Sequence, residues 1–236
     1  MRRACRLLCV KHFALSLSAF LLLLALPVQD PESIASSDTP AGVRPLLVAD
    51  DHDLPALLPK NSQLLIEAEA IEAFLETLEE TLPDWSVVYG RGHHDPQFDE
   101  RLFQLNRNRD ERRRGNVALR WRITFIWPGE LSQFDPGRHG FPVAIGPDFI
   151  HTGWGKVRFK PAEVPSNLTA GAAGALRERL IGRIEKGEVI PIKVAMTGHL
   201  ITEESVIYDF SHEEEGQGLI MPVVEVEQVD YLLAAP

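Results

Sequence analysis

A glycine-framed stretch, Gly146–Gly155, carries the residues that come nearest to a catalytic set. It places Asp148 and His151 between two predicted strands, where loops commonly present functional side chains. An acid that orients an imidazole, which then accepts a proton, is a common basis of general acid–base catalysis. Spacing assigns no nucleophile to this pair. We therefore favour a structural loop that closes one end of the core over a catalytic loop.

Basic side chains alternate along two predicted strands and indicate a possible anion-binding face. If the strands at 117–127 and 154–160 share one sheet, their polar faces gather Arg120, Arg122, Lys156, Arg158 and Lys160, with Trp154 beside them. Yet Glu225 and Glu227 alternate in the same way on the last predicted strand, and opposite charges on neighbouring strands stabilise a sheet. We favour such internal pairing over an anionic ligand.

Residue types that bind metals occur in three short clusters, each with a simpler explanation. Adjacent His93 and His94 point apart on an extended segment, and Asp95 is placed to cap the following helix. The clusters at 50–53 and 212–215 lie where exposed charge is the expected state. The sequence also lacks the motifs of serine hydrolases, zinc proteases, phosphate-binding loops and dinucleotide sites. We predict neither a metal nor a cofactor.

The amino-terminal end has the features of an export signal. Four basic residues precede an uncharged apolar run over 13–26. Because this run is shorter than the roughly 20 residues that cross a bilayer, a cleaved signal peptide over 1–28 is favoured over an uncleaved membrane anchor. Cys5 and Cys9 precede the run, so the exported part has no disulfide or thiolate chemistry. We expect a periplasmic protein if the source is bacterial, and a secreted one otherwise.

The exported part is strongly acidic. The whole chain has 24 basic and 34 acidic residues. Small residues at Ser33 and Ala35 suit a cleavage site, and cleavage after Ala35 leaves 20 basic and 32 acidic residues, a net charge of −12. Such a chain repels phosphate backbones, so nucleic acid is not expected as a partner.

Composition divides the chain into a linker and a domain. Residues 29–60 are rich in Pro, Ser, Ala and Asp without periodicity, which predicts a flexible linker. Residues 61–236 are predicted to form one α+β domain, with a helical part at 61–115 and a β-rich part at 116–236.

The helical part is predicted to begin with a helix near Asn61 that Pro83 ends. Trp85–Tyr89 alternates briefly and predicts a short strand. A second helix is expected after Asp95, ending in a cluster of arginines before Gly115. Cations favourably meet the negative end of a helix dipole, which explains that cluster without a ligand.

The strand that organises the predicted sheet is Val117–Trp127, whose large apolar residues recur at every second position. The residues between them are predicted to face water. Pro128-Gly129 is predicted to end the strand. Further strands are expected at 141–145, 154–160, 189–200, 206–210 and 219–233, with a helix at 170–186. This order predicts α+β: N-terminal helices and then a mainly antiparallel sheet. A small barrel with one inserted helix, like the oligonucleotide/oligosaccharide-binding (OB) fold, is one architecture compatible with it.

These features favour an exported, non-enzymatic binding or interaction module, whose partner is another envelope protein or an anionic ligand. Two alternatives remain open at this stage. One is a hydrolase-like enzyme that uses Asp148 and His151. The other is an accessory protein that contacts the membrane only through an uncleaved amino-terminal segment.

Overall fold

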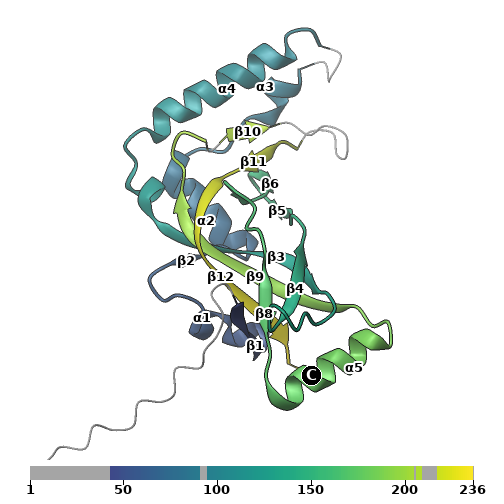
Figure 1. Ribbon diagram of the computed structural model, residues 1–236. Coiled ribbons are helices and arrows are strands. Elements are labelled where there is room, and N and C mark those ends of the chain that lie inside the picture. Colours follow the sequence, from purple (N-terminus) through teal and green to yellow (C-terminus); the bar gives the residue numbers. More distant parts are fainter. Residues whose placement is uncertain (1–42, 91–94, 205, 209–216, 236) are drawn as a thin grey trace, which may run out of the picture. The chain divides into compact units, whose positions relative to one another are not determined.

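A computed structural model of the chain describes residues 43–90, 95–204, 206–208 and 217–235 (Figure 1). The predicted signal peptide at 1–28 lies outside these residues. So do His93, His94 and the cluster at 212–215.

A closed barrel of six strands forms the centre of the fold. Its strands follow one another in the order β1, β8, β4, β3, β9 and β12, and β12 pairs again with β1. In that order they span Val43–Ala49, Thr169–Gly171, Phe141–Ile145, Arg122–Leu131, Ile190–Leu200 and Val223–Ala234. Strand β1 is parallel to both of its neighbours, whereas the other pairs in the ring are antiparallel. The α+β class is confirmed, with a mixed and barrel-like sheet.

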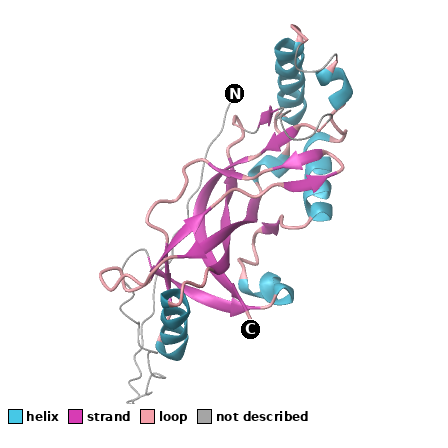
Figure 2. Cartoon of the chain, turned by 90° about the vertical axis from the view of Figure 1, so that its right-hand side faces the viewer, coloured by secondary structure: helices cyan, strands magenta, loops and turns pink. Residues whose placement is uncertain are grey.

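Two short strands extend the barrel, and four others form a second sheet. Strand β2 pairs with β3 and β7 pairs with β12, while the second sheet has the order β10, β11, β6, β5. These strands span Gln63–Leu64, Lys160–Pro161, Val206–Tyr208, Leu219–Met221, Gly155–Val157 and Ile150–Thr152. Figure 2 shows the longer strands, in magenta, curling around a common core.

Five α-helices and two single 3-10 turns are found among the described residues. The helices α1 to α5 span Leu54–Leu57, Ala68–Glu79, Trp85–Tyr89, Phe98–Arg113 and Gly174–Glu185. The 3-10 turns η1 and η2 span Asp51–Asp53 and Val117–Arg120.

The predicted flexible linker is wrong for residues 43–60, which are folded. Strand β1 lies between β8 and β12 and closes the barrel, with Leu46 buried in the core. Helix α1 follows it and buries Leu54. A strand this short, and parallel to both neighbours, has too little periodicity to stand out from a proline-rich segment.

The inner face of β3 matches the predicted alternation. Ile123, Phe125 and Trp127 are all buried, and the ring of Phe125 stacks on Phe159 at 5.5 Å between centroids. The predicted start of this strand is wrong, because residues 117–120 form the turn η2. The predicted stop is wrong as well, since the strand continues to Leu131.

The opposite face of β3 is covered over Thr124 and Ile126, whereas Pro128 and Glu130 on the same face are exposed. Thr124 is fully buried, and its hydroxyl group is 2.7 Å from the hydroxyl groups of both Ser62 and Thr197. Ile126 packs against a second, smaller apolar cluster that includes Leu54. At Thr124 and Ile126 the strand therefore lies between two apolar layers, which alternation alone does not reveal.

The predicted strand at 85–89 is wrong, because these residues form the helix α3. One carboxylate oxygen of Asp84 accepts hydrogen bonds from the backbone N–H groups of Ser86 and Val87, at 3.1 and 3.3 Å. This cap satisfies donors at the start of the helix that have no partner within it. Trp85 and Val88 are buried at helical spacing.

Candidate functional site

The structure places the two residues of the predicted catalytic pair in different local elements. Asp148 lies in the loop before β5, where its side chain accepts a hydrogen bond from the N–H of Phe149 at 2.9 Å. His151 lies within β5, exposed and opposite Lys156 of β6. Asp148 lines a groove described below, and His151 is not among the residues that line it.

Trp154, a predicted ligand-binding residue, is instead part of the core. Its side chain is only 4% exposed, and its carbonyl accepts a hydrogen bond from the indole N–H of Trp85 at 2.8 Å. The guanidinium group of Arg109 lies over its ring, 5.6 Å from the centroid. This arrangement is stabilised by a cation–π contact and leaves little of the ring for a ligand.

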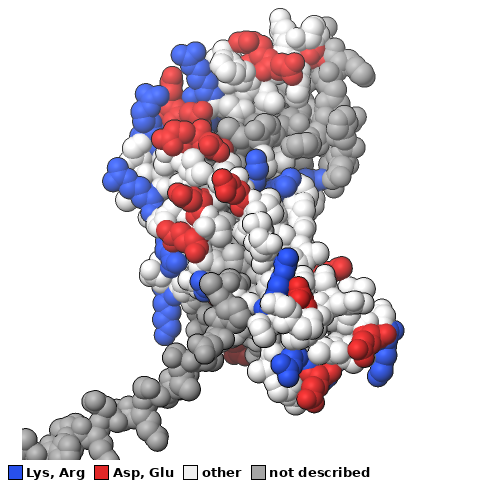
Figure 3. All heavy atoms as spheres, viewed as in Figure 1, with Lys and Arg blue, Asp and Glu red and all other residues white. Residues whose placement is uncertain are grey.

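The residues of the predicted basic face do not share one sheet, because only Arg122 and Lys160 lie in strands of the barrel sheet, and Arg120 lies in the turn η2. Strand β3 is in the barrel, whereas Lys156 lies in β6 of the second sheet. The guanidinium group of Arg158 lies over the rings of Trp127 and Phe149, at 5.7 and 5.5 Å. Lys160 is exposed at the start of β7. On the face shown in Figure 3, acidic and basic side chains are interspersed.

Internal pairing with the last strand is found for one of these residues. Arg122 Nε lies 3.0 Å from the carboxylate of Glu227, and its Nη1 donates to Asn61 at 2.6 Å. Glu227 also lies 3.4 Å from His199, so the three side chains form one group at this end of the barrel.

A buried ionic cluster joins α2 to α4. Glu79 contacts both Arg109 and Arg113, and all three are at most 5% exposed. Arg113 also pairs with Asp110, while Arg109 donates to the carbonyl of Thr81 at 3.0 Å. Burial, together with the charge of Arg113, lowers the pKa of Arg109 to about 10.

The interpretation of the arginine cluster through the helix dipole did not include the burial of Arg109 and Arg113. A signal for it exists in the sequence. The inward stripe of Phe98, Leu102 and Leu105 continues at helical spacing into Arg109 and Arg113. Two cations on the buried face of a helix require an acid opposite them.

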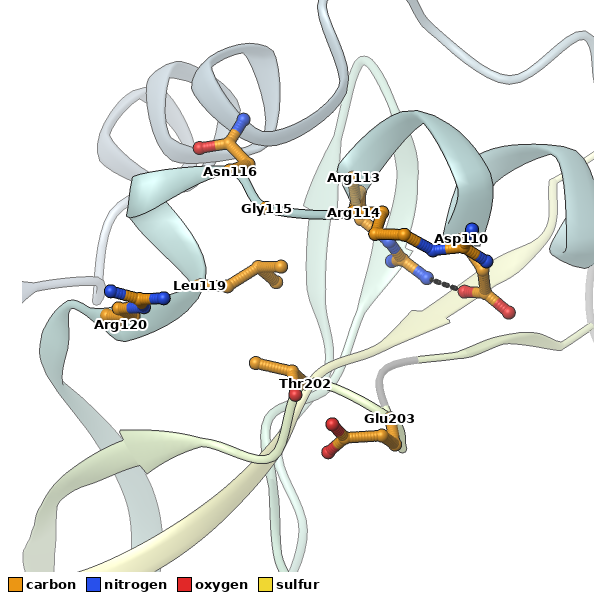
Figure 4. A pocket seen from close by; sticks show the side chains of 9 residues that line it. All are labelled: Asp110, Arg113, Arg114, Gly115, Asn116, Leu119, Arg120, Thr202 and Glu203. Carbon is orange, nitrogen blue, oxygen red and sulfur yellow. Dashed lines mark hydrogen bonds and ion pairs between the residues drawn. The ribbon is translucent and has the colours of Figure 1, made fainter.

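A pocket of about 500 Å³, which we call the arginine pocket, lies where α4 ends (Figure 4). Its lining comes from the end of α4, the turn into η2 and the turn after β9: Asp110, Arg113, Arg114, Gly115, Asn116, Leu119, Arg120, Thr202 and Glu203. In Figure 4, Arg120 lies on one side, with Asp110, Arg113 and Arg114 on the other.

Hydrogen bonds hold the frame of the arginine pocket in place. The Asn116 side chain donates to the carbonyl of Thr77 at 2.7 Å and accepts from the N–H of Ala118 at 2.9 Å. Arg113 is fixed by Glu79 and Asp110. Arg114 and Arg120, by contrast, are exposed, and neither has an ion pair or hydrogen bond with another described residue.

A second depression, the Asp148 groove, lies on the outer wall of the barrel. It consists of two adjoining cavities of about 350 and 160 Å³, which share Leu54, Ile126, Asp148 and Lys193. The larger cavity is lined mainly by apolar residues of β9 and β12, and the smaller also by Ile66, Glu67 and Ile150.

Comparisons with known proteins found no match to a family model, to a curated protein or to a solved structure. Over the described residues, no group of three or more His, Cys, Asp or Glu side chains is placed to hold a metal ion. No helix in the same part of the chain is long and apolar enough to cross a membrane.

Proposed function

We propose that the chain is an exported, non-enzymatic binding module that holds a small organic anion in the arginine pocket. The observation that carries this proposal is the pair Arg114 and Arg120. These two exposed cations come from different elements and line one pocket, whose lining also includes the acids Asp110 and Glu203, yet neither arginine has an ion pair with another described residue. Elsewhere on this acidic chain, Arg122 has an acidic partner in Glu227.

The chemistry of the lining favours an oxyanion. A guanidinium group offers several N–H donors in one plane and matches two oxygens of a carboxylate or phosphate. The hydroxyl group of Thr202 provides one more donor at the same pocket. The volume of about 500 Å³ is within the range of roughly 300–1,000 Å³ typical of small-molecule sites.

Binding without catalysis remains part of the proposal. The described lining residues include neither histidine nor cysteine, and of the two acids in the lining Asp110 pairs with Arg113, while Glu203 follows Thr202 in the chain. Export, and a periplasmic or secreted location, remain part of the proposal because they rest on residues 1–28. The OB-like comparison also belongs here, supported by helix α5 between β8 and β9 of a small barrel.

The test measures thermal stability with citrate and, separately, with pyrophosphate at low ionic strength. A ligand at one hundred times its Kd stabilises the folded state by about 2.7 kcal/mol. Preference for one anion separates a carboxylate site from a phosphate site. We expect the double variant Arg114→Gln with Arg120→Gln to lose at least tenfold in affinity.

The matched control is Arg138→Gln with Arg183→Gln. Arg138 is exposed and Arg183 is partly exposed, and each has an acidic partner, Asp135 and Glu188 respectively. This control removes the same charge and should keep the affinity. The proposal is wrong if neither anion stabilises the wild type, or if the control loses as much affinity as the pocket variant.

A further inference from the structure

One edge of β3 has a gap between two partner strands. Strand β2 pairs with Ile123 and Thr124, and β4 pairs with Gly129 to Leu131. Between these points, over residues 125–128, no strand in the described part of the chain covers this edge. At about 3.3 Å per residue, the gap between Thr124 and Pro128 is roughly 13 Å long.

The hydrogen bonds on both sides of the gap fix the direction of the backbone groups within it. The N–H of Leu65 donates to the carbonyl of Thr124 at 2.8 Å, and the N–H of Gly146 donates to the carbonyl of Pro128 at 3.1 Å. Backbone groups alternate in direction along a strand, so those of Ile126 point to the same edge. Neither its N–H nor its C=O has a hydrogen-bond partner on that edge among the described residues.

The Asp148 groove lies at this gap, because Ile126 lines both of its cavities. Leu54, Ile66 and Ile150 give it apolar walls. The exposed carboxylates of Glu67 and Asp148 stand at the smaller cavity together with Lys193, so two acids and one base line this end. The groove therefore combines an open backbone donor and acceptor with apolar walls and an acidic end.

We propose that the Asp148 groove binds an extended segment of a partner polypeptide, which adds as a short strand between β2 and β4. Its backbone exchanges two hydrogen bonds with Ile126, as in other complexes in which a peptide extends a sheet. Apolar side chains of the segment enter the larger cavity. A lysine or arginine side chain meets Glu67 and Asp148. This second site is independent of the anion proposed for the arginine pocket.

Charge and shape select this partner over others. The N–H and C=O of Ile126 point to the same edge of β3. The backbone of a paired strand offers a matching C=O and N–H, which favours a polypeptide over a lipid or a sugar. Its acidic end, on a chain of net charge −10, favours a basic side chain.

The first measurement is amide hydrogen exchange by NMR on the full chain. The Ile126 amide should exchange at least one hundred times faster than the amides of Phe125 and Trp127, which point to β9. Equal protection at these three residues would show that the edge is already paired and would overturn the proposal.

The second measurement uses the capped peptide acetyl-Val-Lys-Val-Ile-Val-amide, titrated by NMR. Binding should slow exchange at Ile126 and leave that at Phe125 unchanged. Methylation of the central peptide nitrogens should weaken binding at least tenfold, because it removes the donors without removing apolar surface. Replacement of the peptide lysine by glutamate should also weaken binding at least tenfold.

Variants of the chain locate the charge contact. Glu67→Gln with Asp148→Asn should weaken the lysine peptide at least fivefold, and Glu69→Gln with Glu76→Gln, on exposed positions of α2, should not. The proposal fails if the peptide does not bind at millimolar concentration, or if the methylated peptide binds equally well.

Discussion

Replacement of Glu79 by glutamine tests whether the ionic cluster holds α4 on the domain. Glu79 is 4% exposed and contacts two arginines that are 2% and 5% exposed. In the variant, Arg113 keeps Asp110, but Arg109 loses its counter-ion and keeps only neutral partners, the carbonyl of Thr81 and the ring of Trp154. Removal of one partner from a buried ion pair costs about 3–5 kcal/mol, because the remaining charge has no counter-ion.

Urea unfolding, followed by tryptophan fluorescence, gives the free energy of unfolding for this comparison. With a urea dependence of about 2 kcal/mol per M, a loss of 3–5 kcal/mol lowers the midpoint by about 1.5–2.5 M. The control is Glu76→Gln, on the exposed side of the same helix, for which a change below about 1 kcal/mol is expected. Equal losses in the two variants would refute the role given to the cluster.

Three further predictions follow from the fold. Deletion of residues 43–49 should abolish the cooperative thermal transition seen by circular dichroism, because the barrel then has two open edges; a transition within a few degrees of the wild type would contradict the role of β1. Thr124→Val should cost about 1–3 kcal/mol in urea, because it leaves the buried hydroxyl group of Thr197 without this partner; an unchanged midpoint would contradict the prediction. The pKa of Asp84 is lowered below 3.8, chiefly by the hydroxyl group of Ser86, so its contribution to stability is present above that pH and lost as pH falls through the lower folded value. Asp84→Asn keeps the cap but should show a smaller loss of stability between pH 5 and pH 2, measured by urea midpoints; the same loss in both proteins would count against the assignment.

Alternation located the core-facing side of β3 but not its surroundings. Ile123, Phe125 and Trp127 are buried as the pattern predicts. Trp121 belongs to the same pattern, yet it precedes the strand, where it is partly buried against the ring of Phe74 at 6.1 Å. A period of two describes one face, and it does not show whether a second layer covers the other.

The candidate sites depend on contacts between residues that are distant in sequence. Asp148 was selected because it lies in a glycine-framed loop, and it does line a groove. Its expected partner, His151, turned out to be in a strand. Arg120 was selected as part of a basic face and instead lines a pocket with Arg114 and Glu203. No spacing rule relates these residues, because only the fold brings them together.

The parallel pairing of β1 with β12 determines when folding can finish. Leu46 lies opposite Tyr231, so the ring is completed by the first and last of its strands along the chain. Of the six barrel strands, β12 is synthesised last. The barrel cannot close before then, because β1 has no β12 to pair with. Contacts between such distant segments also form slowly, since a long loop must first be closed. If the chain is exported unfolded, as proposed, this delay keeps the barrel open until β12 is available to pair with β1.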